Sequence, residues 1–192
     1  MAMAILPHTC PDLHMERLNA AVALYGSLKQ AEQALEILRS AHFPMAQLSL
    51  AGRQLNHDDL GHSSEGSPAS KLGSRWARCE ELLSGAALFG EADQTYIAVL
   101  GPLVAWIATE RNAGASPQGD TAFGLGMTGV GIPWEMVLSY ETAVSRNQLV
   151  LIGHGTVTEA AAAERFLWRT RPLQLDQYVA APSAMVAGRS IW

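Results

Sequence analysis

Cysteine is scarce in this sequence, with only Cys10 and Cys79 among 192 residues. Two cysteines so far apart provide neither a disulfide framework nor the ligand spacing of a zinc site. The chain also lacks the basic region and long apolar stretch that make up a secretory signal peptide. Together these absences predict a protein of the reducing cytoplasm.

Positive charge is scarce as well. The chain has 13 lysines and arginines against 18 aspartates and glutamates, which gives a net charge of −5. No basic stripe is available to displace counterions from phosphates, so the composition argues against nucleic acid as a partner. Hydrophobic residues make up 48% of the chain, which is enough to bury a core in one domain.

Two segments, 20–31 and 149–160, follow the same pattern. Each is an apolar run followed by a glycine, a hydroxyl residue and, three positions later, a glutamine or glutamate. The pairs are Ser27 with Gln30 and Thr156 with Glu159. A hydroxyl followed by Gln or Glu at this spacing is a capping box, so each segment predicts a strand that turns into a helix.

The pattern of apolar residues predicts the other elements around these two units. Strands are expected over 19–25, 47–52, 148–153 and 173–179, and helices over 27–41, 134–145 and 156–170. This order predicts an α+β fold with a ferredoxin-like, four-stranded antiparallel sheet and two helices on one face. An Ala/Gly-rich helical insertion, with a helix through 76–90, is expected between the two halves.

We expect one domain over residues 19–180, with an arm (1–18) before it and a tail (181–192) after it. The domain divides into a βαβ half (19–52), a polar loop (53–74), the helical insertion (75–132) and an αβαβ half (133–180). The polar loop is rich in Gly, Ser, Asn and Asp, which is typical of turns.

Three further features have a counterpart in a known family. They are the opening segment 22–34, the glycine-spaced segment that ends at 129–133, and the return from Tyr140-Glu141 into strand 149–152. In these features the chain resembles a bacterial family of general-stress or heat-induced stress proteins, a domain of unknown function with a Gly-rich middle segment. The resemblance covers about residues 19–170. It implies the fold above and a stress context, and it supplies no catalytic residues.

Residues 124–129 match the dinucleotide-binding pattern GxGxxG. The segment follows a polar turn instead of a strand, and no strand with an acidic end follows at the required distance. The sequence therefore favours close packing of a helix through its small residues, and we expect no cofactor.

Two groups of residues are candidates for small-ligand binding. His154, Gly155 and Thr156 stand at a helix start, where free amides could hold an anion, although capping by Glu159 is the favoured interpretation. His57, Asp59 and His62 are the only cluster with plausible metal ligands, and a solvated loop is favoured there. No nucleophile has a recognisable setting, so the sequence favours a non-enzymatic protein.

An apolar stretch over 96–108 is shorter than the roughly 20 residues of a membrane span, and it contains Pro102. A buried hairpin that packs on the domain or on a second subunit is favoured. The expected oligomer interface comprises Tyr96, Leu100, Leu103, Trp106, Gly126 and Gly129. We therefore expect a soluble homo-oligomeric interaction or binding module, with a dimer as the first expectation. One alternative is a peripheral or inserted membrane protein that uses 96–108 and 121–132, and another is a metal-binding protein or enzyme that uses the loop from His57 to His62.

Overall fold

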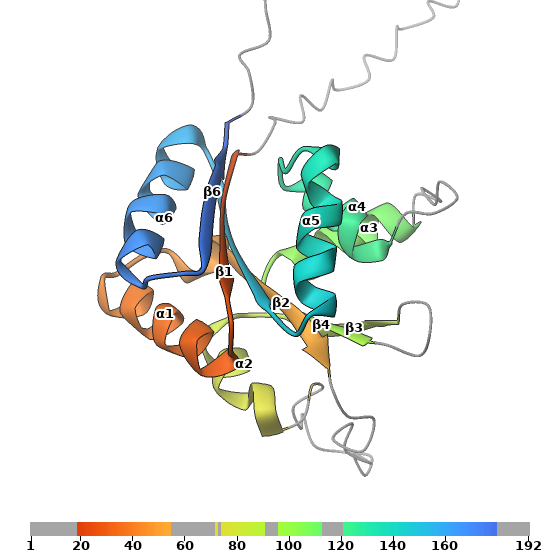
Figure 1. The fold of residues 1–192 in the computed structure, drawn as a ribbon, viewed down its shortest axis with the longest axis horizontal. Helices are drawn as coiled ribbons and strands as arrows, with labels where there is room; N and C mark the ends of the chain where they lie inside the picture. Colours follow the sequence, from red (N-terminus) through yellow and green to blue (C-terminus); the bar gives the residue numbers. More distant parts are fainter. Residues whose placement is uncertain (1–18, 55–71, 73, 91–95, 113–120, 180–192) are drawn as a thin grey trace, which may run out of the picture.

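The computed structural model describes residues 19–54, 72, 74–90, 96–112 and 121–179 (Figure 1). In chain order the elements are β1 (Asn19–Tyr25), α1 (Leu28–Ser40), η1 (Met45–Gln47), β2 (Leu48–Gln54), η2 (Ser74–Trp76), α2 (Ala77–Leu82), β3 (Ala86–Gly90), β4 (Tyr96–Leu100), α3 (Leu103–Asn112), α4 (Ala122–Gly129), α5 (Trp134–Ser145), β5 (Leu149–Gly155), α6 (Val157–Arg169) and β6 (Gln174–Tyr178).

The strands form a six-stranded antiparallel sheet in the order β3-β4-β2-β5-β1-β6. The α+β class is as predicted, whereas the prediction of a four-stranded sheet is wrong. The four predicted strands lie side by side as β2-β5-β1-β6. The insertion adds β3 and β4 beyond β2, because residues 86–90 form a hairpin strand instead of the end of a helix.

Helices cover both faces of the sheet, and the predicted helices α1 and α6 share one of these faces (Figure 1). Figure 1 shows α1, α2 and α6 on one side of the sheet and α3, α4 and α5 on the other. Residues of β1 point alternately into the two cores: Ala21, Ala23 and Tyr25 into the first, and Ala20, Val22 and Leu24 into the second. A strand covered on both faces is apolar at every position, which explains the unbroken apolar runs of β1 and β5.

The two repeated units begin their helices with the predicted capping pairs. Thr156 Oγ1 accepts a hydrogen bond from the Glu159 amide, and Glu159 Oε2 accepts one from the Thr156 amide. At α1, Ser27 Oγ accepts from the Gln30 amide, while Gln30 Oε1 accepts from the Gly26 amide. The local sequence thus sets the residues at which α1 and α6 start.

The GxGxxG segment lies inside α4, where its glycines allow close contact with α3. A Cβ atom at Gly126 would lie 2.3 Å from Ile107 Cγ1, and one at Gly129 would lie 3.1 Å from Trp106 Cε3. Gly153 does the same for α6, since a Cβ atom there would lie 2.6 Å from Ala163 Cβ. The small residues of this chain thus bring helices close to one another and to the sheet.

Candidate functional site

The predicted anion site at the start of α6 is already occupied by a side chain of the protein. Glu159 Oε2 accepts hydrogen bonds from the amide and the hydroxyl of Thr156, each at 2.8 Å, and Glu159 Oε1 accepts one from Gln47 Nε2. The hydrogen bond from the Thr156 amide is the main cause of the lowered pKa of Glu159. A bound anion would lie next to this carboxylate and be repelled by it. The geometry therefore favours capping by Glu159 over anion binding.

His154 lies beside this cap, where its Nε2 atom is buried and has no hydrogen-bond partner among the described residues. Burial lowers the pKa of His154 below its ordinary value of about 6.5, and the nearby Glu159 carboxylate opposes that shift. The folded protein therefore holds the imidazole neutral. Protonation would introduce a charge that the site solvates poorly.

We expect the melting temperature to fall as the pH drops from about 7 to about 5.5. The unfolded chain protonates His154 at the higher pKa, so it binds more protons in this window and acid favours unfolding. The lowered pKa of Glu159 adds stability that is lost only below about pH 4.5. Thermal unfolding of the wild type and of His154→Gln tests this. The melting temperature of the variant should fall less than that of the wild type between about pH 7 and about pH 5.5. Equal losses would contradict the assignment.

The other predicted site residues are the candidate metal ligands and the expected oligomer interface. His57, Asp59 and His62 lie outside the described residues, and the described part contains no group of three His, Cys, Asp or Glu side chains placed to hold a metal. Leu100 and Leu103 are fully buried within the chain, and neither offers a surface to a second subunit. No helix among the described residues is long and apolar enough to cross a membrane.

The remaining residues of the predicted interface also belong to packing inside the chain. Gly126 and Gly129 face α3, and Tyr96 and Trp106 are partly buried. The apolar stretch 96–108 is not a hairpin but strand β4 followed by most of α3, with a turn at Gly101. The oligomer interface expected at these six residues stays a prediction, and the packing inside the chain leaves only Tyr96 and Trp106 among them with a partly exposed side chain.

The sheet has a free edge at β6. This strand pairs with β1 on one side, and no strand lies on its other side within the described residues. Its residues alternate between the two layers: Leu175 packs against the core below α6, and Tyr178 packs against the core below α5. A partner strand added here would therefore face α6 with every second side chain and α5 with the others.

On the α5 side, a partly buried hydroxyl network holds β6 in place. The Tyr140 hydroxyl donates to Asp176 Oδ2 at 2.7 Å and lies 2.6 Å from the Tyr178 hydroxyl. Burial raises the pKa of Tyr140, so its proton stays on the hydroxyl. Beside this network runs an open groove of about 460 Å³, which we call the α5–β6 groove. Its lining residues are Leu24, Glu135, Leu138, Ser139, Thr142, Ala143, Arg146, Gln148 and Gln174.

On the α6 side lies a second open groove, of about 640 Å³, which we call the α6–β6 groove. Its lining residues are Trp168, Arg169, Arg171, Pro172, Leu173, Gln174 and Leu175. The Trp168 residue is 72% exposed and Leu173 is 62% exposed, which are unusually high values for large apolar side chains. Arg169 stands over the Phe166 ring, with its Cζ atom 5.6 Å from the ring centroid.

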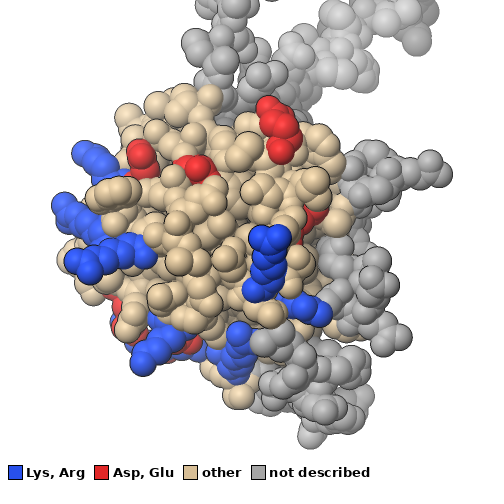
Figure 2. Space-filling model, viewed as in Figure 1, with Lys and Arg blue, Asp and Glu red and all other residues tan. Residues whose placement is uncertain are grey.

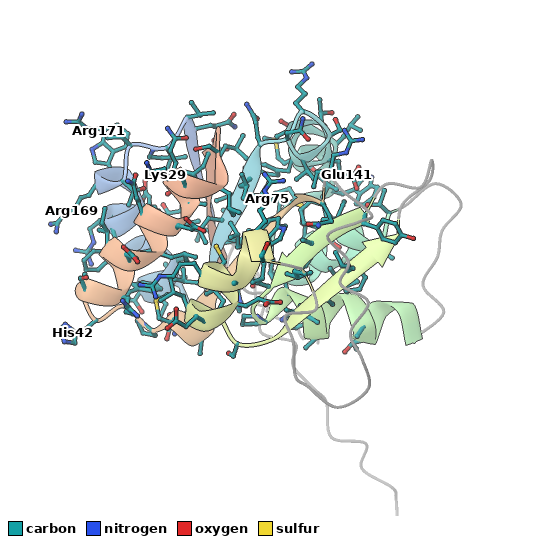
Figure 3. All side chains as sticks on the ribbon, turned by 90° about the horizontal axis from the view of Figure 1, so that it is seen from below. Lys29, His42, Arg75, Glu141, Arg169 and Arg171 are labelled. Atoms are coloured by element: carbon teal, nitrogen blue, oxygen red, sulfur yellow. The ribbon has the colours of Figure 1, made fainter. Side chains whose placement is uncertain are left out.

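Basic side chains gather near this groove. Figure 2 shows lysines and arginines along the side of the molecule where α6 and α1 lie. In Figure 3, Arg169 and Arg171 lie at the same end of the molecule and point away from its body. Neither guanidinium forms an ion pair within the part of the chain that the structure describes. The local charge is thus opposite to the net charge of −5.

Alternating polarity over 173–179 correctly predicts an edge strand, but the sequence analysis missed both grooves. The available signal was an aromatic residue, Trp168, placed next to arginine near the end of an otherwise regular amphipathic helix. No family model, curated protein or solved structure matches this chain, so the function has to be argued from these surfaces.

Proposed function

We propose that the protein is a non-enzymatic binding module that captures an extended segment of a partner protein as a seventh strand beside β6. One observation carries this proposal: among the described residues no strand lies beside the outer edge of β6, and an open groove lies on each face of the sheet where β6 begins. An added strand gains backbone hydrogen bonds from the edge, and its alternate side chains enter grooves on opposite faces. The edge supplies affinity and the two grooves supply selectivity.

The distribution of exposed apolar residues favours this edge over the one at β3. Among the described residues, every exposed large hydrophobic side chain except Ile37 belongs to α5, to α6 or to β6 and its flanks. They are Trp134, Leu138, Val157, Trp168, Leu173 and Val179. Leu173 and Val179 flank β6, and Trp168 and Leu138 line the two grooves beside it. Exposed apolar residues at one sheet edge are typical of an interaction surface.

The homo-oligomer expected from the sequence would use the same edge if it forms, with β6 of a second copy as the added strand. The stress context implied by the family resemblance stays a prediction.

An extended segment of another protein is a better candidate for the β6 edge than a second copy of β6. The α6–β6 groove combines apolar and cationic side chains that two identical strands would not complement. Asp176 would also meet its own copy if β6 paired with itself about its centre, and like charges placed opposite one another are destabilising.

A capped peptide of about seven residues, in which valine alternates with glutamine, tests the proposal, since it is long enough to span the five residues of β6. We expect the peptide to slow hydrogen exchange at amides of residues 174–178 in the full chain, as measured by NMR. The same peptide with every amide N-methylated cannot donate to an edge and should give no protection. Protection elsewhere in the sheet, or none with any peptide, would overturn the proposal.

A matched pair of variants tests whether the peptide binds beside β6. Leu173→Asn removes an exposed apolar side chain beside β6, whereas Ile37→Asn removes one from α1. Both side chains are exposed, so both variants should fold as the wild type does. Only Leu173→Asn should weaken peptide binding. Equal weakening by the two substitutions would show that the peptide adheres to apolar surface in general, and light scattering would show whether the chain pairs with itself instead.

A further inference from the structure

The chemistry of the α6–β6 groove indicates which segment it accepts. We propose that the groove selects an acidic extended segment, in which apolar side chains alternate with carboxylates that pair with Arg169 and Arg171. This inference rests on the proposed function, because it takes pairing with β6 as given and names the partner's charge.

Apolar contacts come from the middle of the groove. Trp168 and Leu173 are highly exposed, and Leu175 is partly buried on the same face of β6. Leu173 and Leu175 stand two positions apart, so they line one face of the strand. An incoming strand has the same period of two, and its apolar side chains can therefore cover this pair and the Trp168 ring.

The charge of the groove comes from two arginines and is not balanced by acidic residues. Of the groove's lining residues none is acidic, and Asp176 is directed to the other face, where it accepts from Tyr140 and from Gln174 Nε2. Arg169 is ordered by its contact with Phe166, which reduces the entropy lost when its guanidinium pairs with a carboxylate.

The α5–β6 groove does not share this charge preference. It contains both Glu135 and Arg146 among mostly uncharged residues. Selectivity for charge should therefore arise on one face of the added strand only. A single-stranded nucleic acid would need a basic track with several stacking aromatics, whereas this groove offers a single Trp168 beside a backbone edge.

Arg171 provides a variant in which binding and stability change in opposite directions. It follows α6 with a φ of 54°, in the left-handed region where glycine is the ordinary residue. Replacing Arg171 with glycine should raise the melting temperature, because arginine is strained in this conformation. The same change should weaken binding of an acidic segment. A merely structural role of Arg171 would not produce this pair of effects.

The test compares three fluorescein-labelled, capped peptides in which valine alternates with glutamate, glutamine or lysine. In about 50 mM NaCl we expect the glutamate peptide to bind the full chain about tenfold more tightly than the lysine peptide, as measured by fluorescence anisotropy. The preference should shrink in about 500 mM NaCl, since the arginines are exposed to solvent. Combined Arg169→Gln and Arg171→Gln substitutions should remove it.

Arg39→Gln controls for net charge, and it is compared with Arg169→Gln and Arg171→Gln made as single changes, so that each variant loses one positive charge. Arg39 is exposed near the end of α1, just before His42, which Figure 3 places away from Arg171. Arg39→Gln should leave the ranking of the three peptides unchanged. Loss of the ranking in that variant would show that the preference reflects overall charge, and would overturn the assignment to the groove.

The outcomes separate the two proposals. Equal binding of all three peptides, with protection at β6, would overturn the acidic preference and leave edge pairing intact. Absence of binding by all three would overturn edge pairing itself. Tighter binding of a labelled oligothymidine of about 12 nucleotides than of the glutamate peptide would overturn the assignment of a protein segment to this groove.

Discussion

Replacing Gly101 with alanine is expected to destabilise the protein strongly. Gly101 connects β4 to α3 with a φ of 86°, and a Cβ atom there would lie 2.2 Å from the Leu48 carbonyl oxygen. The contact involves backbone of β2, which cannot rotate away as a side chain could. Backbone strain and overpacking each cost about 1–3 kcal/mol, so a loss of about 4 kcal/mol is expected. Urea denaturation followed by circular dichroism measures it.

The close approach has a structural cause. The Gly101 amide donates to the Gly85 carbonyl at 2.9 Å, and Ser49 Oγ accepts from the Leu103 amide at 3.0 Å at the start of α3. These bonds hold the turn tightly over β2. The site therefore has little freedom to relax around a new methyl group.

Gly90→Ala is the matched control for Gly101→Ala. Its Cβ atom would lie 3.7 Å from Tyr96 Cε1, an ordinary contact, and Gly90 is not in the left-handed region. The expected change in the free energy of unfolding is within about 0.5 kcal/mol. Similar losses in the two variants would mean that the turn at Gly101 is not specified by its backbone conformation.

Local signals in the sequence predict the two halves of the fold. The capping pairs at Ser27 and Thr156 and the apolar stripe of α1 act over a few residues, so they can be recognised without knowing what packs against them. The strands β1, β2, β5 and β6 follow from apolar runs and, for β6, from alternation. These elements depend on interactions that are close in the sequence.

Local sequence patterns do not predict the hairpin of β3 and β4, because its formation depends on residues outside the strands themselves. Residues 86–90 are Ala-Ala-Leu-Phe-Gly, a composition that suits the continuation of α2 as well as a strand. The outcome depends on Gly85, whose φ of 84° turns the chain, and on pairing with β4. The glycines of α4 are ambiguous in a related way, since small residues permit close packing equally within one chain and between two.

The candidate site was predicted only in part for a similar reason. The edge strand over 173–179 can be recognised from its alternation, whereas the network on its α5 side joins Tyr140 to Tyr178, which are 38 positions apart. The α6–β6 groove likewise exists only where the end of α6 meets β6. A single sequence specifies these residues without showing that they meet.

The second large effect is expected for Trp76→Ala. The Trp76 residue is fully buried in the core below α1 and α2, and its Nε1 atom donates to Gln54 Oε1 at 2.7 Å. Truncation removes the indole and leaves a cavity that the surrounding sheet and helices can fill only in part. We expect a loss of about 4 kcal/mol in the free energy of unfolding, measured by urea denaturation.

Two further variants identify the origin of that loss. Trp134→Ala removes an indole that is 49% exposed on α5, and it should cost less than about 1 kcal/mol. Trp76→Phe keeps much of the buried volume but loses the hydrogen bond to Gln54, so it should cost about 1–3 kcal/mol. A Trp76→Phe loss as large as that of Trp76→Ala would show that the hydrogen bond dominates.

Trp76 packs beneath β2, and β6 lies at one end of the sheet with β5 and β1 in between. Trp76→Phe should therefore lower stability without changing peptide affinity at the β6 edge, which separates the function of the edge from the stability of the core.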